Sequence, residues 1–163
     1  MSSANSAAVD AALIAALSAD MTLKTLLPDG VYVDVAPSNK TRFVIVQFQT
    51  KAITEAFGDT AQYEVFQYRI TARVLMATGV DANAAAFRIH ELLYWMPLAP
   101  IDGYTHMETL QVERVKFTEV DAIDNDIRWQ IAGGDYEIFV SPTATGLPSD
   151  FTPTFDGRVF DVT

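Results

Sequence analysis

The sequence predicts an α+β domain with a curved, mainly antiparallel β-sheet of about five strands, two helices packed on one face, and an extended C-terminal tail. Two observations predict this fold class. Apolar residues follow the helical period in only two segments, and elsewhere up to residue 140 they follow the two-residue period of strands. The resulting order is helix, three strands, helix, two strands, which is typical of helices covering one face of an antiparallel sheet. We expect a single domain over residues 1–140 and an arm or tail over 141–163.

The N-terminal segment predicts a helix that is interrupted once. Between residues 6 and 27, apolar side chains recur on one helical face at positions such as Val9 and Leu13. Asp20 has the character of a new N-cap, so a short second turn should follow it. Residues 28–30, Pro-Asp-Gly, should end that turn because proline and glycine both terminate helices.

Three strands are expected next. Residues 31–35 and 43–51 are rich in β-branched and aromatic residues and should be neighbours in the sheet. Residues 52–62 should form a projecting loop. Residues 63–78 give the clearest strand, because apolar and polar residues alternate along it and predict one buried and one solvated face.

A second helix is predicted over residues 82–96, capped by Asp81 and stopped by Pro97. Its expected buried stripe consists of Ala85, Ile89, Leu92, Leu93 and Met96.

Two final strands, at residues 109–120 and 127–140, should form a hairpin around an acidic turn. In both strands the apolar positions change phase midway. In the second strand the change coincides with Gly133 and Gly134, which predicts a β-bulge there and a strongly curved sheet.

Composition favours one folded domain with a hydrophobic core. The chain has 163 residues, 50% of them hydrophobic, and domains of about 100–200 residues are common. The absence of cysteine excludes a thiol nucleophile, a disulfide framework and a cysteine-based zinc site. A formal net charge of −10 argues against a surface that grips nucleic-acid phosphates. No apolar run approaches the roughly 20 residues of a membrane span, and no basic region of a signal peptide is present, so we expect a soluble protein without membrane contact.

The sequence contains no complete motif for catalysis, cofactor binding or metal binding. His90 and Glu91 begin a near match to the H-E-x-x-H zinc motif, but Tyr94 occupies the position of the second histidine. The nucleophile elbow G-x-S-x-G and the phosphate-binding glycine loops are also missing. We therefore expect no catalytic residues, no cofactor and no metal ion.

Two arginines on the solvated face of the long strand could hold an anion. Arg69 and Arg73 are, however, more commonly paired with acidic residues across the sheet, and Glu113 and Asp135 are the expected partners.

Several segments within about residues 7–140 together resemble one known family. They are Ala11–Asp20 with Leu26, Val31–Pro37, Phe43–Gln47, Tyr68–Leu75, the helix over 82–93, and Arg128–Ile131. Their residue patterns and their order resemble those of the tail terminator proteins of tailed bacteriophages, also called tail completion or tail-to-head joining proteins. The resemblance implies a structural virion protein without catalytic residues. It also implies a hexameric ring that caps the tail tube and joins it to the neck beneath the head.

The same resemblance implies the partners and the location. Further copies of the chain, the tail tube protein and neck or connector proteins would be the partners, and DNA would pass through the lumen without specific binding. The protein would be assembled in the host cytoplasm and reside in the virion. Residues 119–163 have nine acidic and two basic residues, so their net charge of −7 would repel passing DNA and help it slide.

The projecting loop and the tail are the expected subunit or partner contacts, since aromatic residues are enriched at interfaces. The candidate residues are Lys51, Glu55 and Phe57 in the loop and Phe151, Phe155 and Phe160 in the tail.

Two alternatives stay open. The first is another neck or tail component, such as a head-tail connector, a stopper or a tube subunit. The second is a small α+β enzyme or ligand-binding protein that uses His106, Glu108 or Arg73, although their spacing matches no known motif.

Overall fold

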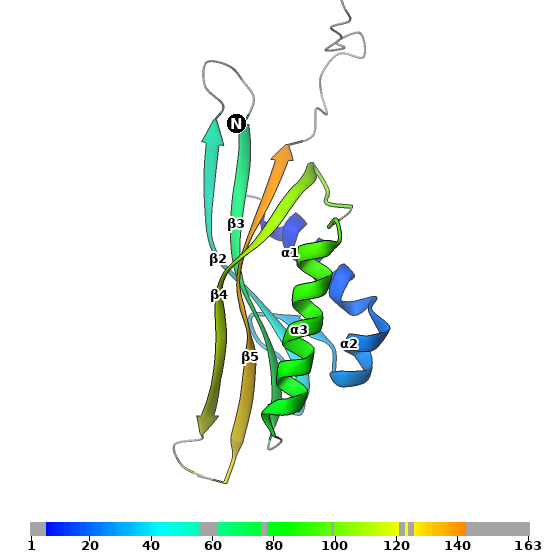
Figure 1. Cartoon of the computed structure of the whole chain (residues 1–163), viewed down its shortest axis with the longest axis vertical. Coiled ribbons are helices and arrows are strands. Elements are labelled where there is room, and N and C mark those ends of the chain that lie inside the picture. Colours follow the sequence, from blue (N-terminus) through cyan, green and yellow to red (C-terminus); the bar gives the residue numbers. More distant parts are fainter. Residues whose placement is uncertain are drawn as a thin grey trace, which may run out of the picture.

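Five strands form one sheet in the order β1-β2-β3-β5-β4, and three helices lie against one of its faces (Figure 1). The computed structural model describes residues 6–55, 62–75, 78–98, 100–120, 123 and 126–142. The elements are α1 (Ser6–Ser18), α2 (Met21–Leu26), β1 (Val31–Val33), β2 (Arg42–Glu55), β3 (Gln62–Leu75), α3 (Gly79–Trp95), β4 (Tyr104–Val120) and β5 (Arg128–Pro142). Only the β1–β2 pair is parallel among the strand pairs of these residues. The predicted α+β fold is confirmed.

The core lies between the helices and the inner face of the sheet. The central strand β3 contributes alternate residues that are fully buried, as its sequence predicts: Phe66, Tyr68, Ile70, Ala72 and Val74. Leu13 of α1 and Ile89 of α3 pack into the same core without exposure. Burial of each large side chain of this kind stabilises the fold by about 1.5–3 kcal/mol.

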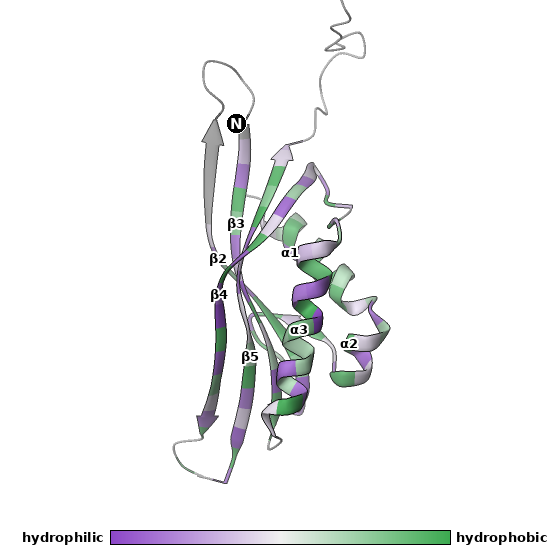
Figure 2. Cartoon of the chain, viewed as in Figure 1, coloured by the Kyte–Doolittle hydropathy of each residue, from purple (hydrophilic) through white to green (hydrophobic). Residues whose placement is uncertain are grey.

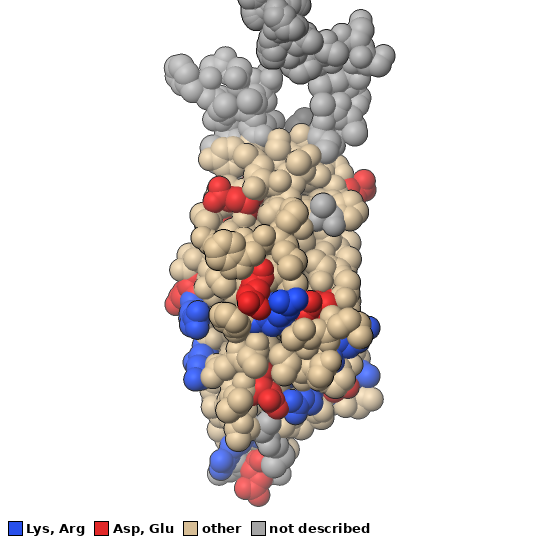
Figure 3. All heavy atoms as spheres, turned by 45° about the vertical axis from the view of Figure 1, so that its right-hand side comes forward, with Lys and Arg blue, Asp and Glu red and all other residues tan. Residues whose placement is uncertain are grey.

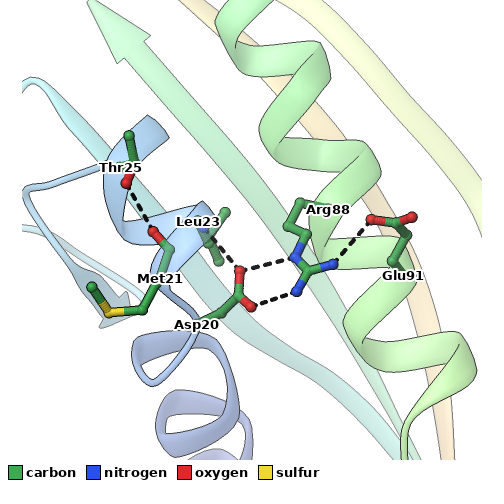
Figure 4. Close-up of polar contacts among 6 residues, drawn as sticks. All are labelled: Asp20, Met21, Leu23, Thr25, Arg88 and Glu91. Carbon is green, nitrogen blue, oxygen red and sulfur yellow. Dashed lines mark hydrogen bonds and ion pairs between the residues drawn. The ribbon is translucent and has the colours of Figure 1, made fainter.

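Asp20 lies between α1 and α2, and its side chain connects α2 to α3 (Figure 4). Its carboxylate accepts a hydrogen bond from the backbone N–H of Leu23 at 2.9 Å, which confirms the predicted N-cap. The guanidinium of Arg88 on α3 donates two more hydrogen bonds to this carboxylate, at 2.9 and 2.6 Å. Arg88 also donates to Glu91 at 3.2 Å. One carboxylate therefore caps α2 and fixes its distance from α3.

The second predicted helix begins earlier and ends one residue sooner than expected. Its N-cap is Thr78 rather than Asp81, and Asp81 lies in the first turn, where it pairs with Arg42 of β2. The expected burial of Met96 is wrong, since this residue is 49% exposed. It is the C-cap in extended conformation, because the following residue is Pro97 and the residue before a proline disfavours the helical region.

The predicted bulge in β5 is wrong. β5 pairs with β3 without a register shift from Trp129 to Val140, and the bulges lie in β4, around Met107 and Val112. The apolar positions of β5 change phase because Ile131 and its neighbour Trp129 face the outer side of the sheet. There the Trp129 ring meets that of Phe43 edge to face at 5.4 Å.

Gly133 and Gly134 instead allow β5 to lie close to β3 and β4. A Cβ atom on Gly133 would lie 2.0 Å from the carbonyl oxygen of Ile70 in β3. One on Gly134 would lie 2.7 Å from the backbone carbonyl oxygen of Glu113 and 2.5 Å from Nε2 of Gln111, both in β4. All three values are far shorter than any van der Waals contact, so only glycine fits where β5 passes between its two neighbours.

Two hairpins extend beyond the helices at opposite ends of the molecule (Figure 1). The predicted loop over residues 52–62 is wrong, because the β2–β3 ladder continues to the pair Glu55 and Gln62. The reason is that Ile53 and Thr54 are β-branched residues, which favour strands, so β2 continues to Glu55. Residues 56–61 then connect it to β3.

The other hairpin, β4–β5, exposes apolar side chains. Figure 2 shows hydrophobic and hydrophilic residues alternating along the lower half of β4. Phe117 and Val120 in this part are 45% and 47% exposed.

Candidate functional site

An exposed aromatic and methionine cluster lies where α3 ends beside the start of β4. Trp95 is 73% exposed and Met107 53% exposed, and the rings of Tyr94 and Trp95 meet edge to face at 4.8 Å. Together with Met96 and Leu110 these residues form the Trp95 cluster. Monomeric proteins rarely expose contiguous apolar patches, and aromatic residues and methionine are enriched at interfaces. The cluster is therefore the best candidate contact surface among the described residues.

Local geometry explains the exposure. The buried stripe of α3 ends at Leu93, so Tyr94 and Trp95, one and two positions further on, point away from the core. Met107 is the extra residue where β4 shifts register, and it has no partner in β5. Bulges of this kind redirect a side chain out of the regular pleat.

Two neighbouring hollows lie along α3 and β4, one at this cluster and the other at a second, basic end. At the second end the lining includes Phe87 and His90 of α3 and Gln111, Arg114 and Lys116 of β4. The hollow at this end has a volume of about 190 Å³, and the one at the Trp95 cluster about 460 Å³. We call the whole feature the α3–β4 crevice.

Positive charge at the basic end comes from two residues. Neither Arg114 nor Lys116 forms an ion pair with any residue of the described ranges, whereas Arg42, Arg69 and Arg88 each do. Figure 3 shows that the basic side chains visible on the helical side of the molecule gather in its lower half, with acidic ones among them. The two cations of the crevice are thus available to an external acidic group.

His90 lies in the crevice as a packed residue. Its ring stacks on that of Tyr94 at 5.2 Å, and its Nδ1 lies 3.4 Å from the hydroxyl of Tyr136. Burial lowers the pKa of His90, and the positive charge of Arg114 lowers it further, so the ring is neutral near pH 7. The near match to a zinc motif is therefore explained by packing. No group of three or more metal-ligating side chains occurs in the part of the chain that the structure describes.

His106 fastens the segment after α3 to β4. The backbone N–H of Leu98 donates to Nδ1 of His106 at 3.0 Å, so Nδ1 must be unprotonated, and Nε2 lies 2.8 Å from Oγ1 of Thr109. Burial lowers the pKa of His106 below its usual 6.5. Protonation of Nδ1 would break the hydrogen bond to Leu98.

We expect acid to destabilise the fold through His106. Because the folded-state pKa is depressed, its contribution to the free energy of unfolding is present above pH 6.5 and is lost as pH falls through the folded-state pKa. Urea unfolding at a series of pH values from 8 to 5 measures this. The variant His106→Asn is the matched control, since the Asn carbonyl can accept from Leu98 without titrating. A wild-type minus variant difference that stays constant over this range would contradict the expectation.

The residues expected to form subunit contacts are not brought together as a described site. Lys51 and Glu55 belong to strand β2 and not to a loop, and the structure does not describe their side chains. The others lie outside the described residues: Phe57, Phe151, Phe155 and Phe160.

Of the residues considered for an enzyme, His106 and Glu108 line the same hollow, but Arg73 lies far from them. Arg73 pairs with Ile131 of β5 and His106 with Val140, nine positions away, which is about 30 Å along a strand. Arg73 lies 4.0 Å from Glu119 across the sheet. The expectation that Arg69 and Arg73 pair with Glu113 or Asp135 is confirmed for Arg69, which donates to Asp135 at 2.8 and 3.1 Å, and is wrong for Arg73, whose partner is Glu119.

Comparison with known proteins gives a match among the solved structures. No protein-family model and no curated protein matches the chain. Among solved structures, it is similar to a chain in the "Virion of native gene transfer agent (GTA) particle". The TM-score is 0.62 with 21% sequence identity, over 86% of this chain and 99% of that chain. The two chains share the same fold over nearly the whole of the virion chain.

The crevice escaped the sequence analysis for two reasons. In the sequence, Tyr94 is part of a near match to a zinc motif and Met96 is part of the expected buried stripe. Trp95 lies off that stripe by helical periodicity, so its exposure could have been predicted. The bulge at Met107 has no sequence signature, because it depends on the register with β5. The exposed Trp at a helix end was the one usable signal.

No helix in the described ranges is long and apolar enough to cross a membrane.

Proposed function

We propose that the protein is a structural component of a phage-like virion, and more specifically a tail terminator. Copies of the chain form a hexameric ring that caps the tail tube and joins it to neck or connector proteins. The observation that supports this is the fold shared with a chain of a gene transfer agent virion, over 99% of that chain. On this proposal the subunits assemble in the host cytoplasm and remain in the virion without enzymatic activity.

Exposed apolar surface at both ends of β4 supports assembly. The Trp95 cluster lies at one end of the strand, and Phe117 and Val120 lie at the other. β4 is also an edge strand, and its unpaired backbone groups favour contact with another chain.

Charge supports passage of DNA through such a ring, since a lumen of negative sign repels phosphates. The β4–β5 hairpin includes the exposed Asp126 and the exposed Glu119, although Glu119 lies 4.0 Å from Arg73. Asp135 adds no free charge to this surface, because it is 5% exposed and paired with Arg69. The negative surface expected for residues 119–163 is therefore smaller than a count of charges suggests.

Light scattering after size-exclusion chromatography, with negative-stain images, tests the proposal. The expected result is a discrete ring of six copies, formed in solution or on purified tail tubes. Long tubes would instead identify a tube subunit. A chain that stays monomeric at high concentration and does not bind tail tubes would contradict the proposal.

A further inference from the structure

The α3–β4 crevice joins an apolar end to a basic end, and this combination suits an extended segment with aromatic and acidic residues. We propose that it receives residues 143–163 of a neighbouring copy of the chain. The inference rests on the proposed function, because it requires copies that meet in an assembly.

The composition of residues 143–163 matches the two ends of the crevice. Each of its three phenylalanines, Phe151, Phe155 and Phe160, has an aspartate beside it in the sequence, and an aromatic ring is suited to the aromatic side chains of the Trp95 cluster. The aspartates are Asp150, Asp156 and Asp161. When Phe151 lies in the Trp95 cluster, Asp161 is ten residues away, about 33 Å in an extended chain, and can reach the two basic residues at the other end. With Arg158 the segment has a net charge of −2 (three acidic minus one basic).

The dimensions also match. From Met107 to Lys116 the crevice follows ten residues of β4, or nine steps of 3.3 Å, which is about 30 Å. Residues 143–163 number 21 and can extend about 70 Å. The segment is therefore long enough to leave one subunit and still fill the crevice of another.

The direction of β5 favours a neighbouring copy over the segment's own subunit. β5 runs antiparallel to β4, from Gly134 opposite Arg114 to Pro142 opposite Tyr104. At its last residue, Pro142, β5 has thus passed the apolar end and points away from the crevice of its own subunit. The chain would have to reverse direction to enter that crevice, whereas the crevice of a neighbour can be entered without a reversal.

Nucleic acid is a poorer occupant of the basic end. Arg114 and Lys116 are two positive charges on a chain of formal net charge −10, and Phe87 at 60% exposure lies beside them. Phosphate binding relies on a wider basic surface, whereas an aromatic and acidic peptide matches both kinds of side chain.

Mixing two full-length variants tests the exchange. The crevice variant combines Trp95→Ser with Lys116→Glu, and the tail variant combines Phe151→Ser with Phe155→Ser. Each alone should associate at least about tenfold more weakly than wild type, since a tenfold change corresponds to about 1.4 kcal/mol. A one-to-one mixture should form pairs, because one partner retains the crevice and the other retains the segment. Analytical ultracentrifugation measures both results.

Two controls keep the result interpretable. Val35→Ser changes an apolar residue that is 76% exposed, against 73% for Trp95, and that lies outside the crevice, so it should leave association at the wild-type level. A synthetic peptide of residues 143–163, added in excess to wild-type protein, should compete for the crevice and disperse the assemblies without any change to the chain.

The outcomes separate this inference from the proposed function. Wild-type association by the crevice variant, or assemblies that resist the peptide, would overturn the crevice inference and leave the ring intact. Weak association by both variants without rescue on mixing would place the segment in its own subunit and overturn the exchange. A wild-type chain that never associates, even on tail tubes, would remove the proposed function as well.

Discussion

Replacement of Gly133 with alanine is expected to lower the free energy of unfolding by about 1–3 kcal/mol or more. The new Cβ atom would lie 2.0 Å from the carbonyl oxygen of Ile70 and 2.7 Å from Cα of Thr71. Both are backbone atoms of the central strand, so no side-chain rotation can relieve the overlap. β5 would have to separate from β3 along a ladder that runs from Glu64 to Leu75. Urea unfolding followed by circular dichroism measures the loss.

Gly79→Ala is the matched control. Gly79 is the first residue of α3, and the nearest atom to its added Cβ is Oε1 of Gln130 at 3.8 Å, an ordinary contact. Because alanine has fewer unfolded conformations than glycine, stability should be unchanged or raised by up to about 1 kcal/mol. Equal effects of the two substitutions would show that β5 and β3 are not closely apposed at Gly133.

Replacement of Asp20 with alanine is the second large effect. Loss of an N-cap alone costs about 1 kcal/mol. The total should be larger, because Arg88 also loses the two hydrogen bonds that join α2 to α3. Thermal unfolding at pH 7 measures the decrease in melting temperature.

Asp20→Asn distinguishes the two contributions. Asparagine is also a good N-cap, so this variant should retain the bond to Leu23 and lose only the negative charge that faces Arg88. Hydrogen bonds from Arg88 hold the pKa of Asp20 below its usual 3.8. The advantage of wild type over the asparagine variant should therefore be full above pH 3.8 and disappear as pH falls through the folded-state pKa. Identical stability of wild type and the asparagine variant at pH 7 would contradict a role for the charge.

Patterns local in sequence were enough to predict much of the fold. The alternation in β3 identified its buried face, and Asp20 was identified as a cap from residue type and position alone. These predictions succeeded because strand periodicity and helix capping depend on neighbours only a few residues away.

Features that depend on pairing between distant segments were not predictable in the same way. Gly133 and Gly134 were interpreted as a bulge, but their cause is the approach of Ile70 and Gln111, which lie far away in sequence. The bulge at Met107 and the exposure of Trp95 likewise become apparent only when α3 lies beside β4. The candidate site was missed for this reason, whereas the fold class was not.

The two hairpins that project from opposite ends of the sheet give the subunit two different ends. In a ring whose axis follows that length, every β2–β3 hairpin would form one rim and every β4–β5 hairpin the other. The two rims would then differ in sequence and in chemistry. A ring with two unlike rims can fit a tube on one side and a different partner on the other, and growth of the tube ends where such a ring binds.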